Sequence, residues 1–242
     1  MESAFTACEA IVRRADPDRY FSALFAPEEK RRHLFALYAL NHELAHVAEA
    51  VREPMIGEIR LQWWREGLEG ARKGDPRPHD VLRALAETFR AVELPQRLFD
   101  EMIDARAADF VPGPFANDRE RDGYLDATSG NLMRLAVRIL GEGDALDGLA
   151  GDAGIAYGLA GLLRSQQHHA ARGKLFLTNA DTARKDAQMR LEAARRTRIP
   201  REAMPAFLPA SLVPLYLKNQ QRDVPLYRKQ LAMLAAALRR RV

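Results

Sequence analysis

Apolar residues recur every three or four positions along almost the whole chain, and this helical spacing restricts the fold more than any other feature of the sequence. In the segment 27–51 the apolar stripe consists of Leu34, Leu37, Tyr38, Ala45 and Ala48. In the segment 56–74 it consists of Ile56, Ile59, Trp63 and Leu68. The same spacing predicts further helices over 79–92, 96–109, 118–141, 145–172, 180–197, 201–219 and 224–241. The pattern therefore predicts an all-α fold.

Proline and glycine separate these segments, at Pro95, at Pro112-Gly113-Pro114, at Gly141-Glu142-Gly143 and at Pro200. No stretch of the sequence alternates apolar and polar residues as a β-strand does, and no internal repeat is present. The joints between the expected helices are too short for a flexible linker between domains. We therefore predict one all-α domain over residues 1–242.

The composition suits a folded core, because apolar residues make up 47% of the chain and charged residues 29%. No apolar run approaches the roughly 20 residues that a membrane-spanning helix needs. The N-terminus is not patterned as a signal peptide, because Glu2 and Glu9 flank and interrupt its short apolar run. The single cysteine, Cys8, rules out an internal disulfide and is expected to be a buried small residue. These features predict a cytoplasmic protein.

The net charge of +4 and the pI near 9.4 permit anionic partners such as diphosphates and acidic lipid headgroups. The densest basic cluster is the closing segment LRRRV, residues 238–242. It suits either the cationic end of a helix or a contact with a membrane surface. The sequence contains no basic-aromatic module of the kinds that bind nucleic acid, so nucleic acid is not expected as a partner.

One short stretch, His42-Glu43-Leu44-Ala45-His46, matches the H-E-x-x-H signature of zinc peptidases. On a helix His42 and His46 share a face, and Glu43 could act as the general base on a zinc-bound water. Glu66 follows at a spacing that would allow it to be the third ligand. The alternative is that both histidines face solvent or line a pocket. The absence of any predicted strand counts against the peptidase, because such enzymes hold their substrate along a sheet edge.

Several longer segments resemble the squalene/phytoene synthase family. ALYALNHELAHVAEAV (36–51) and IGEIRLQWWREGLEG (56–70) are similar to the family's first active-site helix and its partner. YLDATSGNLMRLAVRILG (124–141) and FLPASLVPLYLK (207–218) also resemble family segments, and GIAYGLAGLLRSQQHHAARGKLFLTNA (154–180) resembles the second active-site helix. This resemblance covers nearly the whole chain. It implies an isoprenoid synthase fold, with helices around a central apolar cavity.

In active members of this family, two aspartate-rich motifs hold the Mg²⁺ ions that bind the substrate diphosphate and help it to leave. A hard cation prefers anionic oxygen ligands, and carboxylates at positions i and i+4 of a helix point the same way. The resemblance places the first motif on Ala45 and Glu49, with His46 between them. Of these positions only Glu49 keeps a carboxylate.

The resemblance places the second motif on Ser165 and His169, where Arg164 is retained and Gly161 replaces the usual asparagine. Neutral serine and histidine side chains cannot supply the negative charge that an Mg–diphosphate cluster needs. We therefore expect no metal cofactor. Mg²⁺ would be required only if the chain were an active enzyme.

This pattern of lost aspartates is similar to a branch of the family without catalytic activity, which includes an assembly factor of respiratory complex I. The resemblance implies a protein that acts by binding, with a subunit of the membrane-associated complex as partner and a position at the periphery of the inner membrane. The alternative is an active isoprenoid synthase that transfers prenyl groups from farnesyl or geranylgeranyl diphosphate. A zinc peptidase is the third and more remote hypothesis.

The candidate ligand-binding residues are Tyr38, His42, Ala45, Glu49, Arg60, Trp64, Tyr124, Arg164, Ser165, His168, His169 and Lys174. Of these, Arg60, Arg164 and Lys174 could hold an anion such as a prenyl diphosphate or a lipid headgroup at the cavity mouth. For Arg60 a salt bridge to Glu49 or Glu66 is the structural alternative. The pair His168-His169 is expected on a polar helix face or at the pocket rim.

The aromatic candidates also have structural alternatives. Tyr38 and Tyr124 match pocket positions of the family, but single tyrosines on apolar stripes are commonly core residues. Trp63 and Trp64 could place one ring in the cavity and the other at a partner surface. Packing in the core, with Arg65 in an ion pair, would explain them equally simply.

Overall fold

The computed structural model describes residues 2–51, 53–111, 113–171, 173–219 and 224–242, and within these ranges the chain forms helices and turns without a β-strand. The helices are α1 (Glu2–Ala15), α2 (Pro17–Ala23), α3 (Glu28–Ala50), α4 (Pro54–Arg72), α5 (Asp80–Ala91), α6 (Gln96–Ala105), α7 (Asp118–Leu125), α8 (Asn131–Ile139), α9 (Asp147–Ala171), α10 (Ala180–Arg195), α11 (Met204–Phe207), α12 (Val213–Lys218) and α13 (Leu226–Arg239). The short segments η1 (Arg106–Phe110), η2 (Asp126–Gly130), η3 (Asp144–Leu146) and η4 (Leu208–Leu212) link some of them. The all-α prediction is confirmed. Pro112 and the last residue of the expected helix 145–172 lie outside the described residues.

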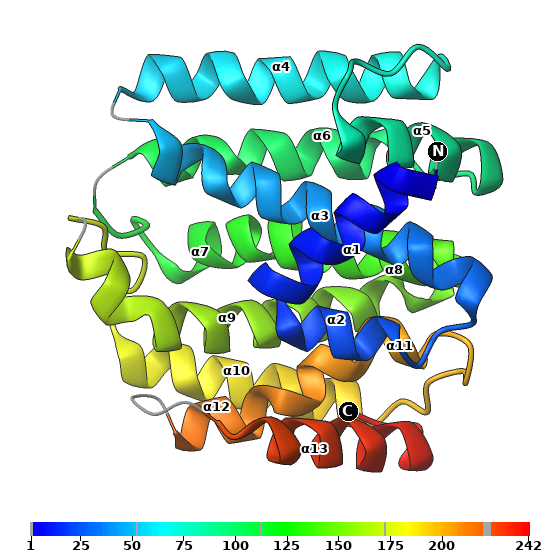
Figure 1. Cartoon of the computed structure of the whole chain (residues 1–242). Coiled ribbons are helices and arrows are strands. Elements are labelled where there is room, and N and C mark those ends of the chain that lie inside the picture. The colour runs from blue at the N-terminus through cyan, green and yellow to red at the C-terminus, as the bar shows by residue number, and fades with distance from the viewer. Residues whose placement is uncertain (1, 52, 112, 172, 220–223) are drawn as a thin grey trace.

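Most of the helices run side by side across the molecule, from α4 at one end of the stack to α13 at the other, and α1 crosses in front (Figure 1). α3, α8 and α9 form the centre, where α3 packs on α8 and α8 packs on α9. Their inward residues are fully or nearly fully buried, which joins the helices in one hydrophobic core. Of the described helices, none combines the length and the apolar character that crossing a bilayer requires.

Three expected helices are interrupted in the structure, and the first of them, 96–109, divides into α6 and the 3₁₀ turn η1. The segment 118–141 divides into α7, a π-helical turn (η2) and α8, where the Thr128 hydroxyl donates to the carbonyl of Tyr124 at 2.8 Å. This turn lies against α9 so closely that a Cβ on Gly154 would come within 2.7 Å of the Gly130 Cα. The segment 201–219 divides into α11, η4 and α12 because Pro209 and Pro214 cannot donate a backbone hydrogen bond within a continuous helix.

The predicted apolar stripe of α4 is wrong for three of its four residues, because only Leu68 is buried. Ile56, Ile59 and Trp63 are 44%, 62% and 37% exposed. The buried side of the helix consists of Gly57, Leu61, Trp64, Gly67, Leu68 and Ala71. Glycine is required at this contact, because a Cβ on Gly57 would lie 2.2 Å from the Phe110 ring. The spacing of the apolar residues correctly predicted a helix. The side of that helix that faces the core is set by the small residues, which allow close packing.

The N-terminal helices α1 and α2 were not predicted from the sequence. α1 contributes Phe5, Cys8 and Val12 to the core, and it packs on α3 and α5. Cys8 is fully buried, as expected, and this burial, together with nearby carboxylates, raises the pKa of its thiol to about 12. The thiol is therefore a packing group rather than a nucleophile.

Candidate functional site

A cavity of about 280 Å³ lies where α3, α7 and α9 meet. Its lining consists of Ala45, Ala48, Glu49, Arg106, Asp109, Tyr124, Leu162, His169, Lys174 and Phe176. Five residues that the sequence marked as candidates are thus brought together, namely Ala45, Glu49, Tyr124, His169 and Lys174. Ala45 and Glu49 share a face because they are four residues apart on one helix. Both matched motif positions of α3 and one of α9 therefore face the same space.

A polar group that sequence reasoning missed forms one wall of this cavity. The Arg106 guanidinium lies 3.3 Å from an Asp109 carboxylate oxygen and donates to the Tyr124 hydroxyl at 3.0 Å. The Tyr124 hydroxyl in turn donates to the other Asp109 oxygen at 2.8 Å. Burial raises the pKa of Tyr124, and Asp109 acts in the same direction. Burial works to lower the pKa of Arg106, but Tyr124 and Asp109 outweigh burial and raise it. The charge of Arg106 is thereby matched within the protein.

Aromatic rings and one lysine form a second part of the wall. The rings of Tyr124 and Phe176 stack at 6.1 Å between centroids, and the His169 ring meets Phe176 edge-on at 4.8 Å. The Lys174 ammonium lies 5.5 Å from the centroid of the Phe176 ring and 3.4 Å from the carbonyl oxygen of Ala108. Burial lowers the pKa of Lys174. A half-buried ammonium beside flat apolar rings suits a ligand with an anionic head and an apolar body.

The residues at the four matched motif positions do not fit a cluster of Mg²⁺ ions. Ala45 carries no polar group, and the Ser165 hydroxyl donates to the carbonyl of Gly161 at 2.9 Å. Glu49, the one carboxylate, lies 3.4 Å from His46. Across the part of the chain that the structure describes, no three His, Cys, Asp or Glu side chains form a group that could hold a metal ion. A hard dication that requires several anionic oxygens would be poorly bound.

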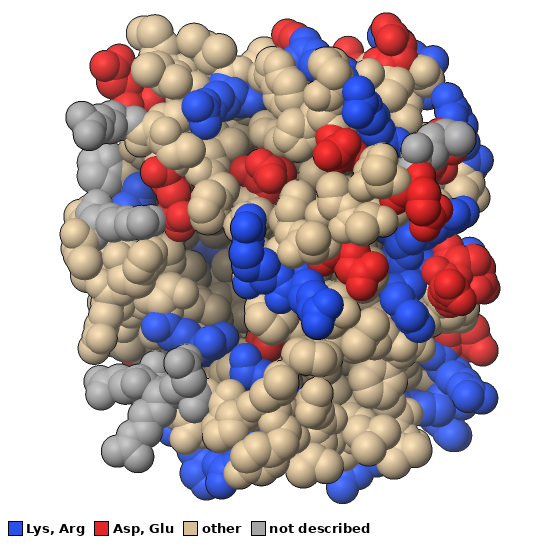
Figure 2. All heavy atoms as spheres, in the orientation of Figure 1, with Lys and Arg blue, Asp and Glu red and all other residues tan. Residues whose placement is uncertain are grey.

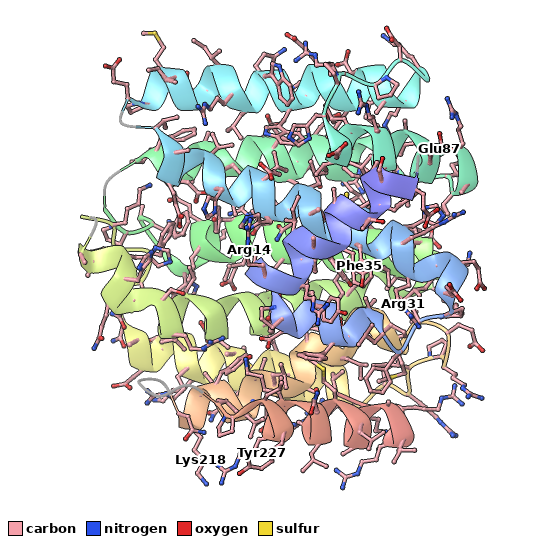
Figure 3. The ribbon with its side chains drawn as sticks, viewed as in Figure 1. Arg14, Arg31, Phe35, Glu87, Lys218 and Tyr227 are labelled. Carbon is pink, nitrogen blue, oxygen red and sulfur yellow. The ribbon has the colours of Figure 1, made fainter. Side chains whose placement is uncertain are left out.

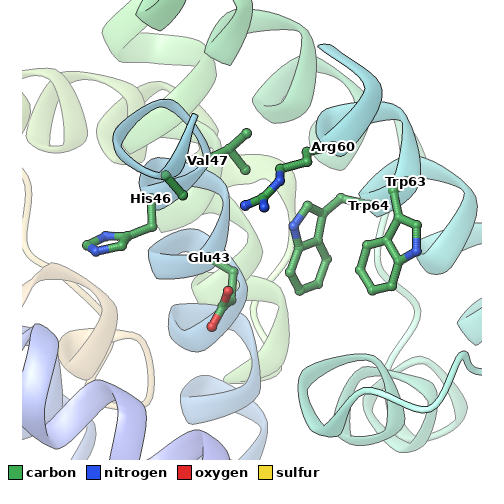
Figure 4. Close-up of a pocket in the computed structure, with 7 residues that line it drawn as sticks. Glu43, His46, Val47, Arg60, Trp63 and Trp64 are labelled. Atoms are coloured by element: carbon green, nitrogen blue, oxygen red, sulfur yellow. The ribbon is translucent and has the colours of Figure 1, made fainter. Parts of the chain in front are cut away.

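A separate pocket of about 400 Å³ lies between α3 and α4 (Figure 4). Its lining consists of Glu43, His46, Val47, Ala50, Arg60, Trp63 and Trp64. Figure 4 shows Arg60 reaching from α4 towards α3, with Trp64 beside it. Trp64 is buried and Trp63 is 37% exposed, so one ring packs inward and the other reaches the surface. Arg65 pairs with Asp100 and Asp104, as the core-packing interpretation expected. Arg60 and Trp64 thus belong to this pocket and not to the first cavity.

The structure does not assemble the zinc site that H-E-x-x-H suggested. The rings of His42 and His46 do lie next to each other on one face of α3, tilted by 41° with centroids 4.6 Å apart. Glu66, however, accepts hydrogen bonds from Gln62 at 3.1 Å and from Arg77 at 2.5 Å. It is held by its own helix and by the loop after it, so it does not join the two histidines. Glu66 therefore does not supply the third ligand that the remote zinc-peptidase hypothesis required.

A second polar cluster, which no sequence pattern indicated, surrounds the buried side chain of Asp18. One Asp18 oxygen accepts hydrogen bonds from the hydroxyls of Tyr157, at 3.0 Å, and of Tyr216. The other oxygen lies 2.9 Å from the Lys229 ammonium. The guanidinium of Arg164 lies 3.9 Å from the centroid of the Tyr216 ring. Burial, followed by the Asp18 charge, raises the pKa of both tyrosines. This Asp18 cluster joins α2, α9, α12 and α13.

The remaining candidates do not line the first cavity. They are Tyr38, His42, Arg164, Ser165 and His168. Tyr38 is buried, with the Arg19 guanidinium 5.8 Å from its ring centroid, and Arg164 belongs to the Asp18 cluster. His168 is exposed on α9, where its ring meets that of His169 edge-on.

The sequence model of the squalene/phytoene synthase family matches residues 12–219 of this chain. The chain belongs to the squalene/phytoene synthase family. The resemblance inferred from the motif segments is thereby confirmed. The crystal structure of a dehydrosqualene synthase has the same fold, with a TM-score of 0.82 over 97% of this chain and 95% of that chain at 17% identity. The prediction of an isoprenoid synthase fold is confirmed as well.

Within this family, two named relatives differ in what they are described to be. "NADH dehydrogenase (ubiquinone) complex I, assembly factor 6" of Rattus norvegicus is 30% identical, over 89% of this chain and 73% of that protein. The phytoene synthase of Mycobacterium tuberculosis is 27% identical, over 79% of this chain and 63% of that protein. The assembly factor therefore resembles this chain over more of its length than the synthase does.

Proposed function

We propose that this protein is a non-catalytic member of the squalene/phytoene synthase family that acts by binding and assists the assembly of a respiratory complex. The observation that carries the proposal is the chemistry of the four motif positions, Ala45, Glu49, Ser165 and His169. A single carboxylate among them cannot neutralise a departing diphosphate through bound Mg²⁺. The nearby carboxylate of Asp109 does not replace the lost ones, because it is already paired with Arg106.

The assembly role is supported by the relatives named as complex I assembly factor 6, which match this chain over most of its length. In this proposal the partner is a subunit of a membrane-bound respiratory complex, and the protein works at the periphery of the inner membrane. In this proposal the synthase fold serves as a scaffold whose surface binds the partner subunit and whose cavity binds a ligand. No cofactor takes part.

The cavity between α3 and α9 is the proposed ligand site. Lys174 supplies a cation, while Tyr124, Phe176 and Leu162 supply apolar walls. This combination fits a lipid or a prenyl diphosphate, which carries an anionic head on an apolar chain. The protein would hold such a ligand without cleaving it, because a single carboxylate at the four motif positions binds the assisting metal ions poorly.

The assembly role is tested by deleting the gene and measuring the amount of assembled complex I on native gels together with its NADH oxidation. We expect both to fall and to be restored by the unaltered chain. The Glu192→Gln variant, changed at an exposed position of α10 outside the cavity lining, is expected to restore them equally. Normal complex I in the deletion strain would contradict the assembly role.

Prenyl transfer with Mg²⁺ is the second candidate function. The similarity to phytoene synthase over 79% of this chain and the presence of a cavity at the motif helices favour it. The two candidates differ in one measurable respect, which is the metal-dependent release of diphosphate.

A further inference from the structure

The last helix, α13, exposes an apolar stripe to solvent. Tyr227, Leu231, Leu234 and Leu238 are 58%, 60%, 46% and 78% exposed. They follow one another at intervals of four, three and four residues, so at about 100° per residue they point within an arc of about 60°. A stripe of large apolar side chains that covers nothing in the protein marks a surface that binds something else.

The orientation of this stripe is fixed by the opposite side of the helix. Met233 and Ala236 are buried, and Lys229 reaches inward to Asp18. α13 packs on η4 and α2 through this side. Tyr227 accordingly points away from the body of the protein, and Lys218 on the neighbouring α12 also lies at this edge (Figure 3). The apolar stripe is therefore presented outward by a helix that is anchored from behind.

The charged side chains of the segment that carries the stripe are all cationic. Residues 224–242 contain five lysine and arginine residues and no aspartate or glutamate. Figure 2 shows blue side chains beside uncharged surface at this lower edge of the molecule, where α13 lies. Arg228, Arg239 and Arg241 are exposed. The surface thus combines apolar side chains with cations, which is the composition of helices that lie in a membrane interface.

A groove of about 560 Å³ runs beside the stripe, between α13 and α12. Its lining consists of Arg195, Ser211, Pro214, Leu215, Ala232, Ala235, Ala236, Arg239, Arg241 and Val242. Three guanidinium groups over small apolar side chains suit a phosphate headgroup with the start of its acyl chain. Arg195 is held towards the groove by a 2.7 Å hydrogen bond to the carbonyl of Val242.

We propose that α13 docks this protein onto an anionic membrane surface, with the stripe among the acyl chains and the arginine groove around a lipid phosphate. Charge complementarity favours this occupant. A second copy seated on the same face would bring the arginines of two chains together. This docking surface rests on the proposed location of the protein at the membrane periphery. Binding to lipid can nevertheless be measured without a respiratory complex, so the two proposals can fail separately.

The opposite end of the stack provides an internal control. α4 also exposes apolar side chains, with Met55 70% and Ile59 62% exposed. Its surface carries Glu58, Glu66 and Glu69 between its arginines, so both signs of charge appear at the upper edge of Figure 2. A face of mixed charge gains little from anionic lipid. Loss of apolar area on α4 should therefore leave membrane binding unchanged.

The test is co-sedimentation of the full chain with vesicles of phosphatidylcholine containing phosphatidylglycerol, against phosphatidylcholine alone. We expect binding to the anionic vesicles and at least about tenfold weaker partitioning for Leu231→Gln with Leu238→Gln, because two large apolar side chains no longer enter the bilayer. The matched pair Met55→Gln with Ile59→Gln on α4 is expected to bind as the parent does. Circular dichroism is used to check that all variants are folded.

Further experiments distinguish a membrane surface from a free anion or a second copy of the chain as the binding partner of α13. Arg239→Gln with Arg241→Gln should weaken binding to the anionic vesicles only, and excess inorganic phosphate should not displace the protein if the stripe also contributes. Displacement by phosphate alone would reduce the site to a simple anion site and overturn the proposal. Absence of binding to anionic vesicles, or an equal loss in the α4 pair, would also overturn it. A dimer that dissociates when Leu231 and Leu238 are replaced would identify a second copy as the occupant instead.

Discussion

The Asp18 cluster and the cavity between α3 and α9 are built from the same chemical groups, but they are arranged for different tasks. In the cluster a carboxylate receives two tyrosine hydroxyls and a lysine, and the whole set is closed within the protein. In the cavity the carboxylate of Asp109 receives Arg106 and Tyr124 beside about 280 Å³ of open volume. The comparison teaches that the space next to a polar group, rather than its composition, decides whether the group stabilises the fold or meets a ligand.

The largest effect should come from breaking the closed cluster. Asp18→Asn leaves Lys229 without its counter-ion and is expected to lower the free energy of unfolding by about 3 kcal/mol. Removing Lys229 as well, with Lys229→Met, should recover part of the loss because no cation is then left unpaired. Urea denaturation measures both changes. Glu192→Gln, on an exposed position of α10, is the matched control. A loss below about 0.5 kcal/mol for Asp18→Asn would mean that the cluster does not hold the helices together.

A smaller effect is expected from the matching change in the cavity. Tyr124→Phe removes the hydroxyl that joins Arg106 to Asp109 and should cost about 1 kcal/mol, while Tyr216→Phe in the closed cluster should cost more. The reason is that water can enter the cavity and replace the lost hydrogen bonds. Chemical denaturation of both variants gives the comparison. Equal losses would show that the cavity wall is as closed as the cluster.

The cavity of the parent chain should not bind Mg²⁺. Millimolar MgCl₂ should leave the melting temperature of the parent unchanged. The double variant Ala45→Asp with His169→Asp adds two carboxylates to Glu49 and should gain about 1 kcal/mol of stability when Mg²⁺ is added. Differential scanning calorimetry detects the shift, and Ala170→Asp, exposed outside the cavity lining, controls for added charge. A shift in the parent itself would show that the motif positions still bind the metal.

The smallest effect should appear in the pH dependence of ligand binding. Burial lowers the pKa of Lys174, so its ammonium loses its charge at a lower pH than an ordinary lysine does. Binding of farnesyl diphosphate without metal, measured by calorimetry, should therefore weaken by up to about twofold as the pH rises from neutral to the lowered pKa. Lys174→Arg should remove this dependence, because guanidinium stays charged. An equal decline in Lys174→Arg, or no binding by the parent, would contradict the assignment of Lys174.

Much of the fold could be predicted from the sequence, because helical spacing and proline or glycine punctuation are local signals. Ala45 and Glu49 could be placed on one face of a helix for the same reason. The register of α4 could not be predicted, since the contact of Gly57 with Phe110 depends on a segment about fifty residues away. The π-helical turn that follows Tyr124 also carried no signal in the spacing.

The polar partners in the site were harder to predict still. The residues that contact Asp18 lie 139, 198 and 211 positions away in the chain. The hydrogen bond from Arg106 to Tyr124 likewise forms only because η1 lies next to α7 in the folded protein. No local pattern marks such contacts, because tertiary packing alone brings them together. His169 and Lys174 were found in advance only because the resemblance to the family places His169 at a motif position and Lys174 shortly after it.

The most direct test of the account is the release of diphosphate from farnesyl or geranylgeranyl diphosphate by the purified full chain with Mg²⁺ or Mn²⁺. The account predicts no metal-dependent release above a protein-free control, because one carboxylate remains at the four motif positions. Metal-dependent release that is abolished by Glu49→Gln would contradict it and identify the protein as an active synthase.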